Sequence, residues 1–458
     1  MSISQRRIEK GMVSRRDFMK GTAVATAAFS VVPSWVLGQN SPSSKINIAG
    51  IGSGGKWAGN LNACKSENIV ALCDVDWDRA GGSFKKWPNA KRFKDFREML
   101  DVMGDKIDAA IIATPDHTHA VAAMACMKKK KHVYVQKPLT RTVYEARMLT
   151  EAARKYGVKT QMGNQGHSGE GIRLICEWIW DGAIGNVKEV HCWTNRPVWP
   201  QGIDRPKEKP SVPASLDWDL WLGPAPYRPY HPTYLPFNWR AWLDFGCGAL
   251  GDMACHVVDA AFTSLKLKYP TSVQASHSYD VPKMWTRFDN KETYPRASIV
   301  HYQFPARAGM SAVKLHWYDG GILPAIPDDM ETGRKIPESG TIFVGDKGSI
   351  VCGTYADSPR IFPESKMRAY KRPTKHIPRV PGGEGGHEQD WVRACKSDYK
   401  ACSNFDYAGP FSETVVMGNM AVLNPGKRLL WDGENMKITN DATANKYVNP
   451  PYRSGWSL

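Results

Sequence analysis

Three glycines and one aspartate form the most informative chemical pattern in this chain. Gly50, Gly52 and Gly55 have the spacing G-x-G-x-x-G, between strand-like residues 46–49 and a helix-like segment. Such glycines permit a tight turn, a close approach of the backbone to a pyrophosphate, and packing of the helix on the strand. Asp74 ends the next apolar run, 24 residues after Gly50, as expected of a carboxylate that binds the adenosine ribose. The pattern predicts an NAD site.

NADP is the less favoured nucleotide, because the Asp74 carboxylate would repel its 2′-phosphate. Asp76 and Arg79 lie close in sequence and leave this choice open. A glycine-rich turn in another kind of α/β protein is the alternative interpretation of the glycines, and the strand, helix and acid around them count against it.

The elements that would position these residues alternate regularly over residues 44–165. The predicted strands are residues 46–50, 69–74, 109–113, 133–135 and 159–162, and the helices between them are residues 57–64, 77–87, 96–103, 119–129 and 143–156. This alternation is typical of a doubly wound parallel sheet, so we expect an α/β Rossmann domain here.

The regular alternation of strands and helices ends at residue 165. We expect residues 166–458 to form a second, α+β domain for substrate binding and oligomerisation. The expected elements are helices 170–180 and 251–265, and strands 187–194, 271–279, 296–304, 311–316, 341–345 and 348–352. Residues 196–238 form a loop rich in Pro and Trp. The strands predict an open, mainly antiparallel sheet.

Residues 1–38 have the features of a targeting segment. Arg15 and Arg16 belong to a Ser-Arg-Arg-Asp-Phe-Met-Lys run that matches the twin-arginine pattern, and residues 21–38 are weakly apolar. We expect the Tat machinery to export the folded protein, for example to the periplasm. The cleavage site is not evident, so a membrane tether through an uncleaved leader is also open. Because free nicotinamide nucleotide is absent outside the inner membrane, we expect the protein to carry a tightly bound cofactor and to regenerate it.

The composition argues against nucleic acid as a partner. The chain has a formal net charge of +16, of which the leader contributes about +4, but Lys and Arg are scattered along the mature part. The ten cysteines include no C-x-x-C pair. Because folding precedes export from a reducing compartment, we expect mostly free, buried thiols, although Cys395 and Cys402 could pair later.

Three further segments supply side chains for chemistry. Thr114, Pro115 and His119 follow one predicted strand, and Lys137 follows the next, where open α/β sheets bind ligands. In the third segment, Asp252, His256 and Asp259 have the spacing i, i+4, i+7, which would put them on one helix face.

These segments resemble the Gfo/Idh/MocA family of sugar and cyclitol oxidoreductases, over essentially the whole mature chain. The resemblance rests on the glycine pattern, on Gln136-Lys137-Pro138 where Glu-Lys-Pro is usual, and on the Gly-rich segment with Asp252, His256 and Asp259. Residues 161–167 and 386–391 are similar to exported branches of the family. The resemblance implies that Thr114, Pro115, His119 and Lys137 help to bind the cofactor. Gln136 departs from the family motif, because a neutral amide replaces the usual acid. This replacement bears on the protonation of Lys137 and on the position of the cofactor.

The chemistry of the side chains agrees with that resemblance. Oxidation of a secondary alcohol needs hydride transfer and removal of the hydroxyl proton. His256, with a pKa near neutrality, would be the base, and Asp252 would orient it or bind a substrate hydroxyl. Lys137 would stabilise the developing alkoxide. An ordinary structural Asp–His pair in a helix is the alternative for His256.

Substrate contacts are expected mainly from the second domain. Aromatic faces bind the C–H faces of sugars, but most aromatics of the Trp-rich loop are better explained by packing or by a subunit interface. Arg196, His231 and Arg240 could add polar contacts or bind an acidic sugar. No metal is expected, because the loop histidines match no ligand spacing. The expected substrate-binding residues are His167, Asp259, Arg196 and Trp199.

The sequence therefore predicts an exported NAD(P)-dependent oxidoreductase acting on a CH–OH group of a sugar, glycoside or cyclitol. One alternative is a redox-neutral enzyme that cleaves glycosides through transient oxidation. Another is a non-catalytic sugar-binding protein of the same fold, for which Gln136 is the best support. The resemblance also implies a homo-oligomer, either a dimer or a tetramer.

Overall fold

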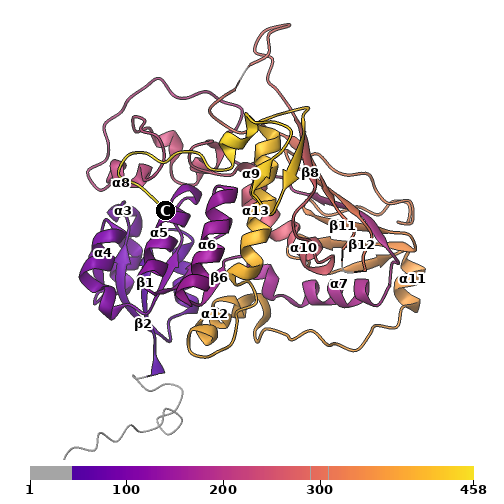
Figure 1. Cartoon of the computed structure of the whole chain (residues 1–458), viewed down its shortest axis with the longest axis horizontal. Helices are drawn as coiled ribbons and strands as arrows, with labels where there is room; N and C mark the ends of the chain where they lie inside the picture. Colours follow the sequence, from indigo (N-terminus) through magenta and orange to yellow (C-terminus); the bar gives the residue numbers. More distant parts are fainter. Residues whose placement is uncertain (1–43, 289, 308) are drawn as a thin grey trace, which may run out of the picture. The chain divides into compact units, whose positions relative to one another are not determined.

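A computed structural model describes residues 44–458 of the chain, apart from Asp289 and Ala308 (Figure 1). The leader, residues 1–38, lies outside the described residues. Within the part that is described, no helix is both long and apolar enough to cross a membrane.

The first sheet is entirely parallel and has six strands in the order β3-β2-β1-β4-β5-β6. The strands are β1 (Asn47–Ile51), β2 (Asn68–Cys73), β3 (Lys91–Phe93), β4 (Ala109–Ile112), β5 (His132–Val135) and β6 (Thr160–Met162). The central strand β4 is apolar and buried at every position, as a strand covered on both faces must be. The strand order reverses at β1, so a crevice opens at the carboxyl ends of β1 and β4.

Five helices connect these strands: α2 (Trp57–Ala63), α3 (Trp77–Lys86), α4 (Phe96–Met103), α5 (Asp116–Lys128) and α6 (Val143–Tyr156). Local sequence sets their ends. A capping box between Thr142 and Glu145 opens α6, and Gly157 closes it with a φ of 65°. Helix α5 begins at Asp116, three residues before the predicted start, directly after Pro115.

The second sheet has nine strands in the order β13-β12-β11-β7-β10-β9-β8-β14-β15. Only the β7–β10 pair is parallel, so the prediction of an open, mainly antiparallel sheet is confirmed. Its strands are β7 (Val187–Trp193), β8 (Ser272–His277), β9 (Ser298–Phe304), β10 (Val313–Tyr318), β11 (Gly340–Gly345), β12 (Gly348–Gly353), β13 (Arg360–Phe362), β14 (Arg428–Asp432) and β15 (Lys437–Ile438).

The helices of the second half are α7 (Glu170–Trp180), α8 (Trp218–Leu222), α9 (Gly248–Val257), α10 (Asp259–Ser264), α11 (Glu364–Ala369), α12 (His387–Cys395) and α13 (Phe405–Val422). The single helix predicted over residues 251–265 is wrong, because the chain forms α9 and α10 with a break at Val258.

Two late helices return to the first sheet. Trp391 and Val392 of α12 belong to the same buried cluster as Ile48 of β1 and Ile111 of β4. Helix α13 packs against α6 and also against β8 of the second sheet. Figure 1 shows α13, in orange and yellow, between α6 and the second sheet. Residues near the end of the chain therefore complete the hydrophobic core of the Rossmann sheet.

All ten cysteines are unpaired, and eight of them are buried. Cys395 and Cys402 are half-buried. Burial raises the pKa of the Cys126 and Cys176 thiols to about 12, so these thiols stay protonated.

Candidate functional site

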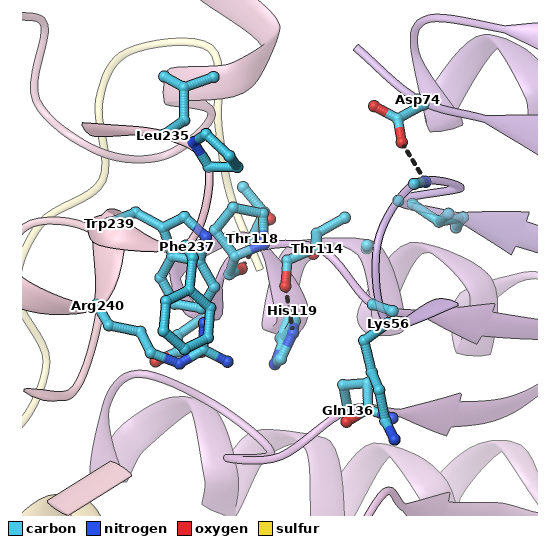
Figure 2. Close-up of a pocket in the computed structure, with 18 of the residues that line it drawn as sticks. Lys56, Asp74, Thr114, Thr118, His119, Gln136, Leu235, Phe237, Trp239 and Arg240 are labelled. Carbon is cyan, nitrogen blue, oxygen red and sulfur yellow. Dashed lines mark hydrogen bonds between the residues drawn. The ribbon is translucent and has the colours of Figure 1, made fainter. Parts of the chain in front are cut away.

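A cavity of about 420 Å³ lies at the carboxyl ends of the parallel strands. One wall comes from the loops after β1, β2, β4 and β5, and the other from α9 and the loop 235–240. Figure 2 shows Phe237, Trp239 and Arg240 facing the strand ends across this space. The side chains that line the cavity include those of Asp74, Thr114, Pro115, Asp116, His119, Lys137, Arg196, Arg240, Asp252, His256, Tyr355 and Trp456.

The glycine loop has the geometry of a phosphate-binding turn. Gly52 lines the cavity with a φ of 81°, and a Cβ there would lie 2.8 Å from the carbonyl carbon of Ala113 and from the amide of Thr114. Only glycine fits this approach of the β1 loop to the end of β4. Gly54 also lines the cavity, whereas Gly50 lies within β1 and Gly55 lies against Arg79.

Asp74 lies at the end of β2, where it fixes the glycine loop. Its carboxylate accepts hydrogen bonds from the Gly54 amide at 2.9 Å and from the Asp76 amide at 3.0 Å. Burial raises the pKa of Asp74 to about 6, although these two amides act in the opposite direction. Figure 2 shows the Gly54 bond as a dashed line.

His119 links the loops after β4 and β5. Its Nε2 lies 2.8 Å from the Thr114 carbonyl oxygen, and its Nδ1 lies 2.8 Å from the Pro138 carbonyl oxygen. Burial lowers the pKa of His119 to about 4, against the effect of the two carbonyls. The neutral imidazole donates to one of these two carbonyl oxygens and lies packed between Thr114 and the Lys137-Pro138 turn.

At the other end of the cavity, three cations surround one carboxylate. Lys137 Nζ and Arg240 Nε each lie 2.9 Å from Asp252 Oδ1, and Arg196 Nε lies 3.9 Å from Oδ2. Burial alone would raise the pKa of Asp252, but Lys137 and Arg240 lower it below its ordinary value. Asp252 therefore holds Lys137, and the hydrogen bonds of its carboxylate do not include one to His256, contrary to the expected orienting role.

His256 lies one helical turn after Asp252 and is buried. The Tyr355 ring meets the imidazole edge-to-face, with a centroid separation of 4.9 Å, and Nδ1 has no hydrogen-bond partner. Burial and the Lys137 charge lower the pKa of His256 well below its ordinary value. The prediction of a pKa near neutrality is therefore wrong, because desolvation disfavours the imidazolium.

Two of the expected substrate ligands lie outside the cavity lining. Asp259 accepts hydrogen bonds from Asn164 at 3.0 Å and from His167 Nδ1 at 2.9 Å, in a buried network that also includes Tyr407. Neither Asp259 nor His167 lines the cavity. The carboxylate of Asp259 is instead occupied by this buried network.

Trp199 also lies outside the lining, and its ring packs edge-to-face against Phe237. Arg196 does line the cavity. The aromatic loop is mostly a packed cluster, since Trp218 and Trp221 stack at 4.8 Å and are buried.

The sequence reasoning missed several lining residues. Asp116 opens α5, and its Oδ1 is buried without a hydrogen-bond partner. Tyr355 follows β12, and Trp456 belongs to the last residues of the chain. Neither aromatic has a motif around it. Asp116, in contrast, directly follows the strand-end residues Thr114 and Pro115, and that position was an available signal.

The cavity fits a dinucleotide. It has a glycine turn next to a helix N-terminus at one wall, a carboxylate at the end of β2, and the unpartnered Thr114 Oγ1 beside the end of β4. The residues that would hold the nucleotide are Gly52, Gly54, Asp74, Thr114, Pro115 and Lys137.

Comparison with known families defines the class of protein. Residues 44–164 match the model described as "Oxidoreductase family, NAD-binding Rossmann fold", and residues 186–287 match its "C-terminal alpha/beta domain". Residues 12–31 match the twin-arginine translocation signal sequence. The matches identify an NAD-binding Rossmann domain of the Gfo/Idh/MocA type in residues 44–164, the C-terminal alpha/beta domain of the same type in residues 186–287, and a twin-arginine signal before them.

Curated relatives match over part of their length. The inositol 2-dehydrogenase of Rubrobacter xylanophilus is 32% identical over 143 residues, which are 31% of this chain and 40% of the relative. The levoglucosan dehydrogenase of Pseudarthrobacter phenanthrenivorans is 27% identical over 36% of this chain and 35% of its own. The chain thus matches less than half the length of these relatives.

Solved structures share the fold across most of the chain. The WlbA dehydrogenase from Bordetella pertussis, in complex with NADH and UDP-GlcNAcA, has a TM-score of 0.57 at 14% identity and covers 85% of this chain and 99% of its own. Levoglucosan dehydrogenase in complex with NADH has a TM-score of 0.55 at 19% identity, covering 83% of this chain and 96% of its own.

Proposed function

We propose that this protein is an exported oxidoreductase that transfers hydride between a hydroxyl-bearing carbon of a sugar, glycoside or cyclitol and a retained nicotinamide cofactor. The observation that carries the proposal is one cavity with a dinucleotide end, marked by Gly52 and Asp74, and a reactive end, marked by Lys137, Asp252 and His256. The curated relatives, named as inositol and levoglucosan dehydrogenases, support a polyol substrate.

In this proposal, Lys137 acts on the reacting oxygen. Its ammonium group is held by the Asp252 carboxylate and by the Asp252 carbonyl oxygen, 2.6 Å from Nζ. A charge fixed in a buried site stabilises the oxygen of a developing alkoxide without reorganising in the transition state. The bound nicotinamide would supply the hydride acceptor.

His256 accepts the hydroxyl proton in this scheme. Its lowered pKa keeps the imidazole neutral, so a nitrogen lone pair is present over the whole physiological pH range. Tyr355 covers the imidazole and limits the access of water.

The charge at the reactive end favours a substrate with a carboxylate. Lys137, Arg196 and Arg240 surround one fully charged carboxylate, Asp252, within 3.9 Å. The second carboxyl group at this end, Asp116, has a pKa raised to about 7 by burial, so much of it is neutral. The site therefore has a positive surplus, which an acidic sugar such as a uronate would neutralise.

A second candidate is redox-neutral cleavage of a glycoside. This reaction needs an additional acid or base, and Asp116 has the properties of one. It lines the cavity, its Oδ1 has no partner, and its pKa of about 7 lets it donate or accept a proton. Release of an aglycone without net change in nucleotide redox state would distinguish this candidate.

The test begins with the nucleotide content of the purified mature protein. After denaturation, chromatography should recover close to one NAD(H) per chain. Turnover should then be measured on neutral sugars, cyclitols, glycosides and uronates, with products identified. We expect a neutral hexose to react more slowly than its uronate.

Variants then test the residue roles. Lys137→Met and His256→Asn should each lower turnover by about 10²–10⁴-fold, while the matched control Lys188→Met, at an exposed position on β7, should not. Unchanged turnover in both site variants would contradict the proposal. A protein that neither holds nor binds NAD would instead indicate a non-catalytic sugar-binding protein.

A further inference from the structure

The end of the chain contributes a wall of the cofactor cavity. Figure 1 shows the C-terminus beside α5 and α8. Trp456 lines the same cavity as Asp74, although the two residues lie far apart in sequence. This segment lies outside the regions that the family models match, residues 44–164 and 186–287.

Hydrogen bonds fix this segment on both sides of Trp456. The Arg453 amide donates to the Pro224 carbonyl oxygen at 2.9 Å, and its guanidinium donates to the Gly223 carbonyl oxygen at 3.0 Å. Lys128 Nζ donates to the Leu458 carbonyl oxygen at 3.0 Å. The indole is therefore held at the cavity by contacts that do not involve the indole itself.

Trp456 lies at the end of the cavity that Asp74 marks. The Asp74 amide donates to the Phe93 carbonyl oxygen at 3.1 Å, and Phe96, three residues further along, packs against the indole with a centroid separation of 6.1 Å. The Arg97 guanidinium lies 4.4 Å from the centroid of the indole ring system. Phe96 and Val75 line the cavity here as well. The aromatic rings of Trp456 and Phe96 lie here among charged side chains, which are those of Asp74, Asp76, Arg79, Lys94 and Arg97.

We propose that Trp456 is a cofactor-binding residue, and that residues 450–458 close the adenosine end of the cavity so that the nucleotide dissociates slowly. An indole half-buried at the edge of a nucleotide cavity offers an aromatic face to a purine, and Phe96 adds a second aromatic surface. The proposal rests on the cofactor site described above and explains how an exported chain retains its nucleotide.

Removal of the indole should mainly increase the rate of nucleotide dissociation. Base–aromatic stacking corresponds to about 10- to 100-fold in affinity, and loss of a covering group acts on the dissociation rate more than on the association rate. Loss of Arg453 should have a smaller effect in the same direction, because it only positions the segment.

The experiment measures NADH dissociation from mature protein freed of its own nucleotide and reloaded. The variants are Trp456→Ala, Trp456→Phe and Arg453→Ala. The matched control is Trp285→Ala, whose side chain is 94% exposed and does not line the cavity. The readouts are NADH fluorescence in a displacement chase, the dissociation constant by calorimetry, and thermal unfolding without nucleotide.

Trp456→Ala should release NADH about 10- to 100-fold faster than wild type, Trp456→Phe should recover most of the retention, and Trp285→Ala should match wild type. All variants should unfold at similar temperatures without nucleotide. Equal dissociation rates for wild type and Trp456→Ala would overturn this proposal and leave the cofactor site intact. Failure of the wild-type protein to bind NADH would overturn both.

Discussion

Asp74 is buried, yet its proposed role as an acceptor for the ribose hydroxyls requires the carboxylate to be ionised. Two amide hydrogen bonds support the charged form, but desolvation outweighs them and its pKa is about 6. Because this pKa is above the ordinary value, ionised Asp74 destabilises the native state at neutral pH. That destabilisation disappears as the pH falls from about 6 toward the ordinary value.

The affinity for NAD should therefore fall as the pH decreases below about 6, since a protonated Asp74 loses acceptor capacity for the ribose. Calorimetric titrations between pH 5 and pH 8 would measure this, in wild type and in Asp74→Asn. Wild type should lose up to about tenfold in affinity per pH unit below the pKa. Asp74→Asn should bind weakly with little pH dependence.

Asp116 is the other carboxyl group of the cavity with a raised pKa, and the variant Asp116→Asn shows whether its titration contributes to the pH dependence of NAD affinity. The variant should keep the decline in affinity below pH 6, because Asp116 lies at the reactive end and has a pKa of about 7. If Asp74→Asn kept the decline and Asp116→Asn removed it, the assignment of Asp74 to the ribose would be wrong.

At the scale of elements, the turn after β1 places glycine where any side chain would collide with β4. Gly52→Ala would combine a φ of 81° with a Cβ contact of 2.8 Å to backbone atoms of Ala113 and Thr114. We expect a loss of about 2 kcal/mol or more in unfolding free energy, together with loss of NAD binding. Urea unfolding and calorimetry would measure both.

The matched control is Gly59→Ala in α2. No atom outside the local helix backbone lies within 4 Å of a Cβ built there, and its φ is ordinary. This substitution should stabilise the protein by about 0.5–1 kcal/mol and leave NAD binding unchanged. Equal effects of the two substitutions would show that the turn does not have the special role assigned to it.

The sequence predicted the elements whose pattern is local. Strands such as β4 and helices such as α6 carry apolar runs or caps that determine them without distant partners. Strand β3 (Lys91–Phe93) has three residues at a sheet edge, two of them charged, and so has no apolar signature. Its position follows from pairing with β2.

The site was predictable where residues follow strand ends, and less so where it depends on tertiary packing. Lys137 and Thr114 line the cavity because the ends of parallel strands meet there. Asp259 lies outside the cavity lining because its carboxylate accepts hydrogen bonds from Asn164 and His167, 95 and 92 positions away, and the local sequence does not predict these contacts. The contribution of Trp456 depends on contacts with residues more than 200 positions away, such as that between Arg453 and Gly223.

At the scale of the whole molecule, the twin-arginine segment should direct export of a folded, cofactor-loaded protein. The segment that matches the signal model includes Arg15 and Arg16. Arg15→Lys combined with Arg16→Lys should hold the protein in the cytoplasm, because the signal depends on the arginine pair. Cell fractionation and immunoblotting would measure this, with Arg6→Lys and Arg7→Lys as the control pair.

The nucleotide content of the retained variant is a second readout. Cytoplasmic protein from the Arg15→Lys and Arg16→Lys variant should contain as much NAD(H) per chain as the exported wild type, if loading precedes export. Export of the double variant at wild-type levels would contradict the role of this arginine pair.

The return of α12 to the first sheet has a consequence for the timing of biogenesis. The leader leaves the ribosome first, and the Rossmann strands follow it, but the core beneath β1 and β4 lacks Trp391 until most of the chain has been synthesised. N-terminal domains commonly fold while the rest of the chain is still being translated. The Rossmann domain of this chain cannot finish folding in that way, because its core is incomplete until α12 has been synthesised. A route that exports proteins only after they have folded therefore suits this chain, since a helix near its C-terminal end completes the core of its N-terminal domain.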